Sequence, residues 1–254
     1  MSDFIGISEA RARKGLRLVL LRGLPSPWSQ AAKGIFELER VPFQKVQLLP
    51  EEPRELLREW TGQDSFPAAM YDDERPRTGW AEILLLAERL AEKPSLIPAE
   101  PADRALMFGL SHEICGELGL GWCRRLASLG AAMRAGGNPA LAAMGQKYGS
   151  SRAEEERASA RCAEVLRLLS QQLERQQRAG RRHLVGEALS AVDLYWATMC
   201  NLVAPLPPEQ LALPDAMRFA FECRDPEVLA ALSPALLAHR DRIYAEHLRL
   251  PVEL

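Results

Sequence analysis

The first part of the chain alternates between short apolar runs and amphipathic stretches, a pattern that predicts a sheet whose strands are joined by helices. Residues 16–21 form an aliphatic run that predicts a buried strand. The run ends in the sequence GLPSP, which is typical of a loop. The following pattern predicts helices over 28–40, 51–60 and 79–91 and strands over 42–49, 67–71 and 75–77. These elements make one domain of βαβ–ββα order.

From residue 102 onward the pattern is helical throughout, with the longest predicted helices at 102–134 and 151–179. Glycine- and proline-rich breaks at 136–139 and 205–208 interrupt it. Residues 1–15 are polar and lack sustained periodicity, so we expect a mobile or strapped-on extension. The predicted organisation is therefore an extension, an α/β domain, a proline-rich linker and an all-helical domain, with boundaries at 1–15, 16–93, 94–101 and 102–254.

Composition narrows the class of protein. The chain has 254 residues, of which 47% are hydrophobic and 26% charged, and its formal net charge is −2. This balance is typical of a globular protein and lacks the basic field of a dedicated nucleic-acid binder. No run of about 18 apolar residues predicts a membrane span, and the first residues lack the apolar core of a signal peptide. We therefore expect a cytoplasmic protein.

The five cysteines are odd in number and form no Cys-x-x-Cys pair. This pattern speaks against a disulfide framework or a zinc site and predicts buried free thiols. His183, His239 and His247 also lack metal-ligand spacing with acidic or thiol residues. We expect no metal.

Three segments together resemble the glutathione transferase superfamily. They are LVLLRGLPSPWSQAAKGIFEL at 18–38, the Phe66-Pro67 pair just before a predicted strand, and GEALSAVDLYWA at 186–197 in the helical half. The order and spacing of the segments carry the resemblance, which covers the chain after residue 15. It implies a thioredoxin-like N-terminal domain, an all-α C-terminal domain, glutathione as co-substrate and a homodimer.

In this family the loop after the first strand presents a catalytic side chain to the glutathione sulfur, and Ser26 matches that position. A hydroxyl donor at the positive end of a helix favours the thiolate. Ser26 fits equally well as an N-cap that only stabilises the helix, because Pro27 follows it. Ser29 is an alternative catalytic residue, and Trp28 is a further candidate for contact with glutathione. A cysteine here would suggest redox chemistry, and the loop has none.

Phe66-Pro67 matches the position at which the family has a cis-proline. There the residue before proline offers its backbone N–H and C=O to the cysteinyl part of glutathione, which any side chain permits. The alternative is an ordinary trans turn. Gln63, just upstream, is a further candidate contact.

The chain departs from the family at the start of its third helix. Members usually have a Glu/Gln-Ser pair there, which holds the γ-glutamyl group, whereas this chain has Gly79-Trp80. Thr78 and Glu82 are the nearest substitutes, and Trp80 offers no hydroxyl and adds bulk. Losing a charged or hydroxyl partner costs a ligand about 1–3 kcal/mol. Arg22 and Arg77 are further candidates to compensate for the missing pair.

Two further predictions concern the helical half. Ser190 and Asp193 have the spacing of a capping box, whose role is folding. An electrophile pocket is expected along the helix that begins near 102, where His112 is the one group able to act as acid or base near pH 7. The predicted pocket residues are Met107, Leu110, Ser111, His112, Cys115 and Trp122.

Two functions remain open. The first is a glutathione S-transferase in which Ser26 stabilises the thiolate for attack on a small hydrophobic electrophile. The second is a non-catalytic binding or scaffold protein that keeps the fold and has lost normal glutathione binding. Ser26 with Phe66-Pro67 favours the first, and Gly79-Trp80 favours the second.

Overall fold

The chain divides into two compact units. The computed structural model describes residues 4–92, 95–134, 136, 142, 144–146, 148–149 and 151–253. One unit comprises Met1–Ile97 and adds Val252–Leu254, and the other is Pro98–Pro251. Of the predicted linker over 94–101, Pro94 lies outside the described residues, and the unit boundary falls at Ile97. The predicted break at 136–139 also lies outside them, except for Gly136.

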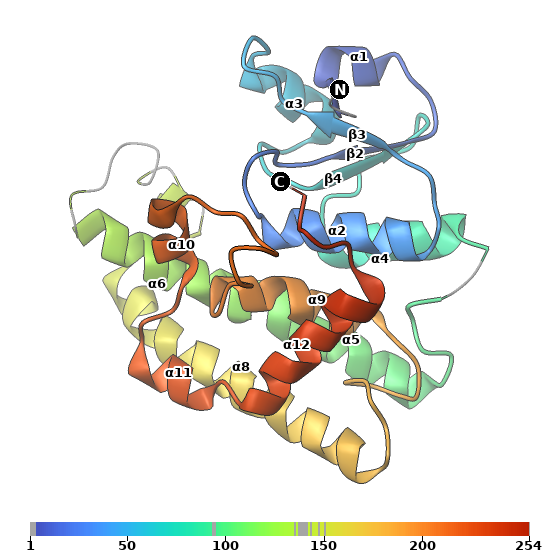
Figure 1. Cartoon of the computed structure of the whole chain (residues 1–254). Coiled ribbons are helices and arrows are strands. Elements are labelled where there is room, and N and C mark those ends of the chain that lie inside the picture. The colour runs from blue at the N-terminus through green and yellow to red at the C-terminus, as the bar shows by residue number, and fades with distance from the viewer. Residues whose placement is uncertain are drawn as a thin grey trace. The chain divides into compact units, whose positions relative to one another are not determined.

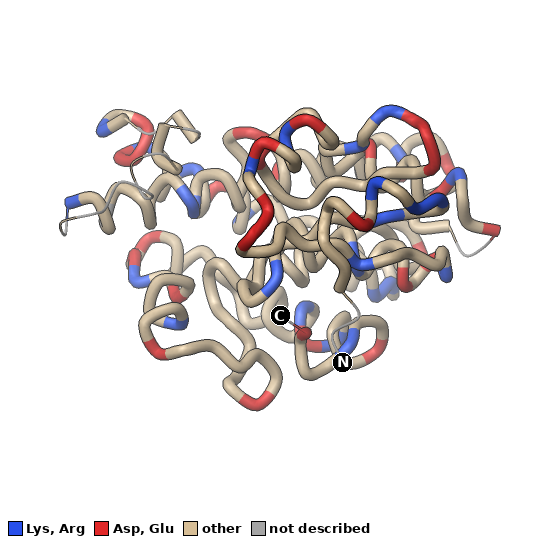
Figure 2. The backbone as a smooth tube through the Cα atoms, turned by 90° about the horizontal axis from the view of Figure 1, so that it is seen from above, with Lys and Arg blue, Asp and Glu red and all other residues tan. Residues whose placement is uncertain are grey.

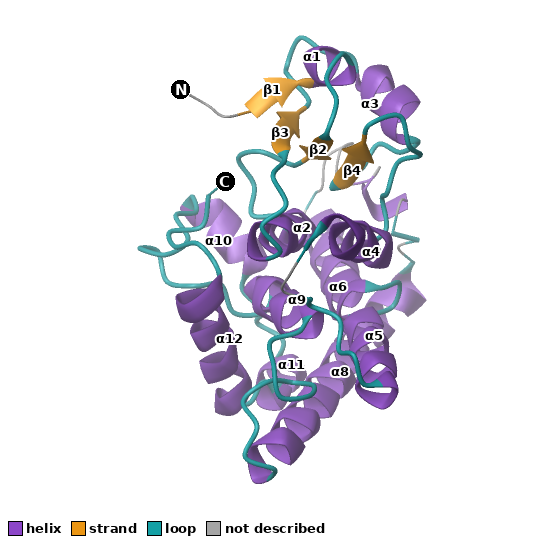
Figure 3. Cartoon of the chain, turned by 90° about the vertical axis from the view of Figure 1, so that its right-hand side faces the viewer, coloured by secondary structure: helices purple, strands orange, loops and turns teal. Residues whose placement is uncertain are grey.

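A four-stranded sheet forms the centre of the first unit, in the order β1-β3-β2-β4 (Figure 3). β3 is parallel to both β1 and β2, whereas β4 is antiparallel to β2. The predicted strand at 75–77 is reduced to a single bridge between Ala69 and Arg77. The strands are β1 (Phe4–Gly6), β2 (Leu16–Val19), β3 (Gln44–Gln47) and β4 (Ala68–Tyr71).

Helices cover both faces of this sheet (Figure 1). α1 (Ile7–Arg11) and α3 (Arg54–Thr61) lie on one face. α2 (Pro27–Leu38) and α4 (Trp80–Leu90) lie on the other. α2 and α4 turn apolar sides inward, as the sequence pattern predicts. The connection from β2 through α2 to β3 is therefore the predicted βαβ unit.

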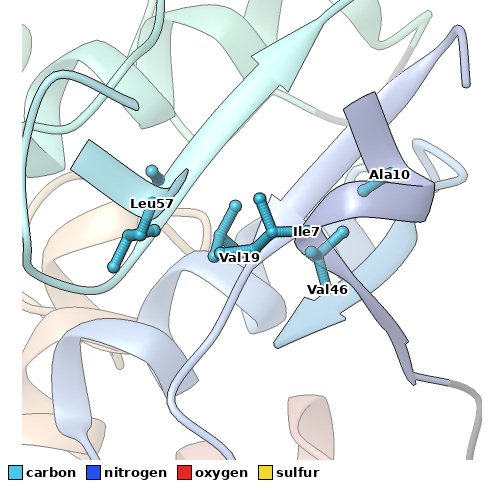
Figure 4. Packing of buried hydrophobic residues seen from close by; sticks show 6 residues of the cluster. Ile7, Ala10, Val19, Val46 and Leu57 are labelled. Atoms are coloured by element: carbon cyan, nitrogen blue, oxygen red, sulfur yellow. The ribbon is translucent and has the colours of Figure 1, made fainter. Parts of the chain in front are cut away.

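The prediction that residues 1–15 form a mobile or strapped-on extension is wrong. Strand β1 pairs with β3, and helix α1 follows it directly. Ile7 and Ala10, three positions apart, are fully buried with Val19, Val46 and Leu57 (Figure 4). A three-residue strand is too short to show periodicity. It becomes visible only through its distant partner strand.

A carboxylate from another segment closes the start of α1. Glu52 accepts hydrogen bonds from the backbone N–H groups of Ile7 at 3.0 Å and Ser8 at 2.7 Å. Burial alone raises a carboxyl pKa, but the bonds from Ser8, Leu49 and Ile7 outweigh it and lower the pKa of Glu52. The N-terminal segment is thus tied to the domain by charge-assisted hydrogen bonds as well as by apolar packing.

An acid is buried at the end of α2. Glu39 is 1% exposed, and its two carboxyl oxygens have no hydrogen-bond partner among the described residues. Burial, and then the neighbouring Glu88, raises the pKa of Glu39 to about 9. Glu39 is therefore neutral in the folded chain at pH 7. Glu88 itself is occupied by the backbone N–H groups of Leu96 and Ile97.

Glu39→Met is expected to stabilise the first unit at neutral pH. In the unfolded chain Glu39 ionises near its ordinary pKa of 4.5, whereas the folded chain holds the proton up to about 9. Unfolding is therefore favoured increasingly as pH rises through that window, by about 3 kcal/mol at pH 7. Denaturant unfolding of both chains from pH 4.5 to 9 measures the difference. Parallel stability curves across that range would show that Glu39 is ionised in the folded state.

The second unit is helical throughout its described part. Its helix α9 is buried along its whole length, the property of a helix at the centre of a bundle. A short 3-10 helix, η1, follows α9 directly. The elements are α5 (Pro101–Cys115), α6 (Leu120–Arg134), α8 (Arg152–Arg178), α9 (Ala191–Met199), η1 (Cys200–Leu202), α10 (Asp215–Phe221), α11 (Pro226–Ala231) and α12 (Pro234–His247).

The single helix predicted over 102–134 is divided into α5 and α6. The chain turns at 116–119, where Leu118 has a positive φ of 58°. A Cβ at Gly119 would lie 2.7 Å from the carbonyl oxygen of Glu113, closer than real side chains allow. Glycine at 119 therefore permits a tight turn that the apolar periodicity on either side of it conceals.

Asp193 joins three segments of the helical unit: the loop before α9, α9 itself and α12. It is fully buried, and its carboxylate accepts hydrogen bonds from the backbone N–H of Leu184 at 2.9 Å and of Ser190 at 3.0 Å. The Ser190 hydroxyl lies 3.2 Å from the same carboxylate, and Nε2 of His239 lies 2.8 Å from it. Arg242 in turn contacts Nδ1 of His239 at 3.0 Å. The predicted capping box is present and extends to α12.

Charge is spread along the chain rather than gathered, with basic and acidic positions interspersed (Figure 2). All five cysteines are free and buried, as predicted. Within the described residues no group of His, Cys, Asp and Glu is arranged to hold a metal ion. In that same part of the chain no helix combines the length and apolarity needed to cross a bilayer.

Candidate functional site

The loop after β2 places Ser26 at the start of α2. Ser26 is the N-cap residue, and Pro27 occupies the first helical turn, as the sequence predicts. The Ser26 carbonyl accepts the N–H of Gln30 at 2.9 Å, which begins the helix. Its side chain, however, makes no capping hydrogen bond with the described residues. Ser26 is 8% exposed as a residue, and its hydroxyl is not used to cap the helix.

Ser29, the alternative catalytic residue, has a different position. It is 1% exposed, and its hydroxyl oxygen accepts the backbone N–H of Leu21 at 3.5 Å. Ser29 thus ties the loop to the first turn of α2. Trp28, between the two serines, is half-buried. Of the two serines, Ser26 is the one whose hydroxyl makes no hydrogen bond with the part of the chain that the structure describes.

Phe66-Pro67 lies just before β4, at the end of the sheet where β2 leads into the loop that carries Ser26. In the antiparallel pairing of β2 with β4, Val19 is opposite Ala68, so the end of β2 lies beside the start of β4. The Phe66–Pro67 peptide bond is cis. Neither the N–H nor the C=O of Phe66 has a hydrogen-bond partner among the described residues. This open peptide group can pair with an extended ligand as a strand would.

The side chain of Gln63 stabilises the loop that precedes β4. Its side-chain amide donates to the carbonyl oxygens of Ser65 at 3.2 Å and Pro67 at 3.0 Å. Thr61, which is buried, donates its hydroxyl hydrogen to the carbonyls of Leu57 and Gln63. The donor groups of Gln63 therefore hold the conformation around Phe66 and are not available to a ligand.

The start of α4 is closed by a side chain of the chain itself. Gly79 is the N-cap, and the Glu82 carboxylate accepts the backbone N–H of Gly79 at 3.2 Å and of Thr78 at 3.3 Å. Arg75 donates to the other oxygen of Glu82 at 2.6 Å. The hydrogen bond from Arg75, and then those from the two backbone groups, lower the pKa of Glu82. A carboxylate is thus already bound to the two backbone N–H groups that precede the first turn of α4, where it would repel a second anion.

The other candidates around α4 are also engaged. Thr78 and Trp80 are half-buried. Arg77 pairs with Glu74 at 2.8 Å. Arg22 donates weakly to Gln47 at 3.4 Å and lies over the ring of Phe4. Sequence reasoning missed Arg75, whose only signal is its place seven residues before Glu82 in a loop.

The predicted pocket residues of α5 and α6 fall into two groups. Met107, Leu110, Ser111 and Cys115 are almost fully buried in the helical unit, at 0–4% exposure. Within this group the Ser111 hydroxyl lies 3.5 Å from the sulfur of Met107, and burial raises the pKa of the Cys115 thiol. His112 is exposed, and Trp122 stacks edge-on against Tyr148.

Glutathione fits one part of this site and not another. The open Phe66 peptide and the unused Ser26 hydroxyl suit a cysteinyl unit and its sulfur. At the start of α4 a γ-glutamyl carboxylate would have to displace Glu82 from the two N–H groups or approach it as a like charge. The start of α4 therefore offers such a carboxylate no open N–H group at Thr78 or Gly79.

Comparison with known proteins supports the fold. No protein-family model matches the chain, and no curated protein matches it. Solved structures do. A glutathione S-transferase from Methylobacillus flagellatus with glutathione bound has a TM-score of 0.62 at 15% identity, covering 91% of this chain and 95% of its own.

Two further bacterial structures agree. A glutathione S-transferase from Xanthobacter autotrophicus has a TM-score of 0.61 at 16% identity, covering 94% of this chain and 98% of its own. One from Methylobacterium radiotolerans, in complex with glutathione sulfonate, has a TM-score of 0.60 at 17% identity and covers 92% of both chains. The predicted fold class is confirmed: this chain has the fold of the glutathione S-transferase superfamily, a thioredoxin-like unit followed by an all-helical unit.

Proposed function

We propose that the chain is a glutathione S-transferase-like enzyme that binds a low-molecular-weight thiol and stabilises its thiolate for transfer to a small apolar electrophile. The observation that supports this most is the Ser26 hydroxyl, which stands at the start of α2 and is not used to cap it. The bound thiol supplies the nucleophilic sulfur. Glutathione is the thiol that the fold suggests, and its affinity is expected to be low.

Ser26 acts on the sulfur through its hydroxyl and its position. The O–H donates a hydrogen bond to the developing thiolate, and the first backbone N–H groups of α2 add the positive end of the helix dipole. Both favour loss of the thiol proton to water, because an ordinary thiol with a pKa of about 8.5 is mostly protonated at pH 7. The Phe66 peptide orients the thiol by pairing with its backbone.

Ser26→Ala is expected to lower kcat/KM for conjugation by about a hundredfold or more, the usual cost of removing one hydrogen-bond donor to a reacting anion. Ser26→Thr, which keeps a hydroxyl, retains much of the rate. The measurement uses reduced glutathione with a panel of aryl halides and unsaturated carbonyl compounds. A rate that falls only in Ser29→Ala would place the catalytic hydroxyl at Ser29 instead.

A second candidate is a non-catalytic ligand-binding protein of the same fold. Glu82, with Arg75, fills the position where related proteins would receive a γ-glutamyl group. This candidate predicts that no thiol is conjugated by the wild-type chain, and that Ser26→Ala has no effect on any binding or rate. A conjugation rate that depends on Ser26 separates the two.

A further inference from the structure

A second charged cluster is formed by Gln30 and Lys33 of α2, Lys45 of β3 and Glu253. The carboxylate of Glu253 binds Nζ of Lys45 at 2.7 Å and 2.8 Å and Nζ of Lys33 at 3.3 Å. The backbone carbonyl of Glu253 accepts from the side-chain amide of Gln30 at 2.8 Å. Residues 252–254 belong to the first unit, so these contacts lie within it. The carboxylate and the backbone carbonyl of Glu253 are thus bound by the side chains of three residues, Gln30, Lys33 and Lys45.

The cluster borders a small pocket. Its walls combine apolar side chains from β1 and the end of β2 with polar groups of α2. Glu253 closes part of it. The lining residues are Phe4, Leu20, Leu21, Ser29, Gln30, Lys33 and Glu253. The pocket holds about 10 Å³, so the apolar part of a ligand would reach these walls only when Glu253 is displaced.

Positive charge exceeds negative charge around this pocket. Lys33 is 6% exposed, and the side chain of Lys45 is 13% exposed. Lys45 and Arg22 both lie over the ring of Phe4, at 5.7 Å and 5.5 Å from its centroid. The acids near Lys33 are Glu253, whose carboxylate is bonded to it, and Glu37. Without Glu253, two lysines that are largely removed from water would lack their bonded anion, which is costly.

Lys33 is largely removed from water, and the carboxylate of Glu253 favours its charged form. Burial lowers the pKa of Lys33, and Glu253 and then Glu37 oppose that effect. Burial raises the pKa of Glu253, and Lys45 and Lys33 more than compensate, so that the pKa lies below its ordinary value. A second carboxylate from solution would satisfy the same lysines equally well.

We propose that Gln30, Lys33 and Lys45 form a binding site for a small carboxylate that carries a neighbouring carbonyl and an apolar group, as in an N-acylated amino acid, and that Glu253 is its resident ligand in cis. The ligand's carboxylate pairs with the two lysines, its carbonyl accepts a hydrogen bond from the Gln30 amide, and its apolar group packs against the pocket walls. Access depends on displacement of residues 252–253. Ser29, the alternative catalytic residue, lines the pocket, but Ser26, Phe66 and Ser29 are not among the three binding groups, so the site is tested separately from the proposed thiol chemistry.

The test is calorimetric titration of N-acetyl-L-glutamate into the full chain and into Glu253→Gln. Glu253→Gln is expected to bind the probe at least about tenfold more tightly, because a ligand tethered in cis competes at high effective concentration. Adding Lys33→Met and Lys45→Met abolishes the gain. Glu246→Gln is the matched control, since it removes an acid of α12 that pairs with Arg182 and leaves the site intact.

Stability measurements guard against a variant that fails to fold. The probe should raise the thermal midpoint of Glu253→Gln and leave that of the double lysine variant unchanged. The proposal is overturned if Glu253→Gln binds the probe no more tightly than wild type. It is equally overturned if binding persists without both lysines.

Discussion

Glu82→Ala is expected to bind reduced glutathione about tenfold more tightly than the wild-type chain. The substitution frees the backbone N–H groups of Thr78 and Gly79 at the start of α4 and removes a negative charge from the place where a γ-glutamyl carboxylate would bind. A hydrogen bond to a charged group is worth about 1.5–3 kcal/mol, which corresponds to a tenfold to hundredfold change in affinity. Calorimetric titration measures it.

Two matched variants separate charge from bulk. Glu82→Gln keeps an acceptor oxygen at the helix start and removes the charge, so its affinity should lie between those of wild type and Glu82→Ala. Trp80→Ser restores a hydroxyl and removes bulk while leaving Glu82 in place. If Trp80→Ser alone restores binding and Glu82→Ala does not, the obstruction is Trp80, and the assignment to Glu82 is wrong.

Asp193→Ala is expected to lower the free energy of unfolding of the helical unit by roughly 3–5 kcal/mol, the cost of removing one partner from a buried charged network. It leaves the N–H groups of Leu184 and Ser190 and the ring of His239 without their shared acceptor. Urea unfolding followed by helical circular dichroism measures the change. Ser190→Ala, which removes only the hydroxyl contact, should cost about 1 kcal/mol.

The difference in stability between these two variants shows whether Asp193 does more than cap α9. If Asp193→Ala loses no more stability than Ser190→Ala, Asp193 is only a local helix cap. A larger loss shows that it joins α9, α12 and the segment before them into one folding unit. A neutral Asn at 193 should also be destabilising, because it cannot offer two acceptor oxygens.

Local signals predicted the starts of two helices. Ser26 and Pro27 at the start of α2 and the Ser190–Asp193 box were predicted from residues a few positions apart, whereas the role of Phe66-Pro67 rests on the resemblance to the glutathione transferase superfamily. A helix start depends on its own first turn, so neighbouring residues suffice to predict it. The same is true of the main strands and helices, whose apolar periodicity is long enough to be recognised.

Features that depend on distant partners could not be predicted in this way. Strand β1 is three residues long and is defined by its pairing with β3. The Glu253 carboxylate reaches Lys45 across 208 positions of the chain. The sequence identifies Glu82 as a possible ligand contact. Its hydrogen bonds with Arg75 and with the start of α4 depend on how the loop before α4 folds, so they could not be predicted. The break between α5 and α6 was concealed because the apolar pattern continues through Gly119.

Thiolate stabilisation by Ser26 is tested most directly by ultraviolet titration of the thiol of bound glutathione across pH. The chain to use is Glu82→Ala, in which binding is expected to be tight enough to saturate, compared with Glu82→Ala/Ser26→Ala. The bound thiol should have a pKa lower by about one unit or more when Ser26 is present, as the loss of one hydrogen bond to an anion implies. Equal thiol pKa values in the two variants would contradict a catalytic role for Ser26.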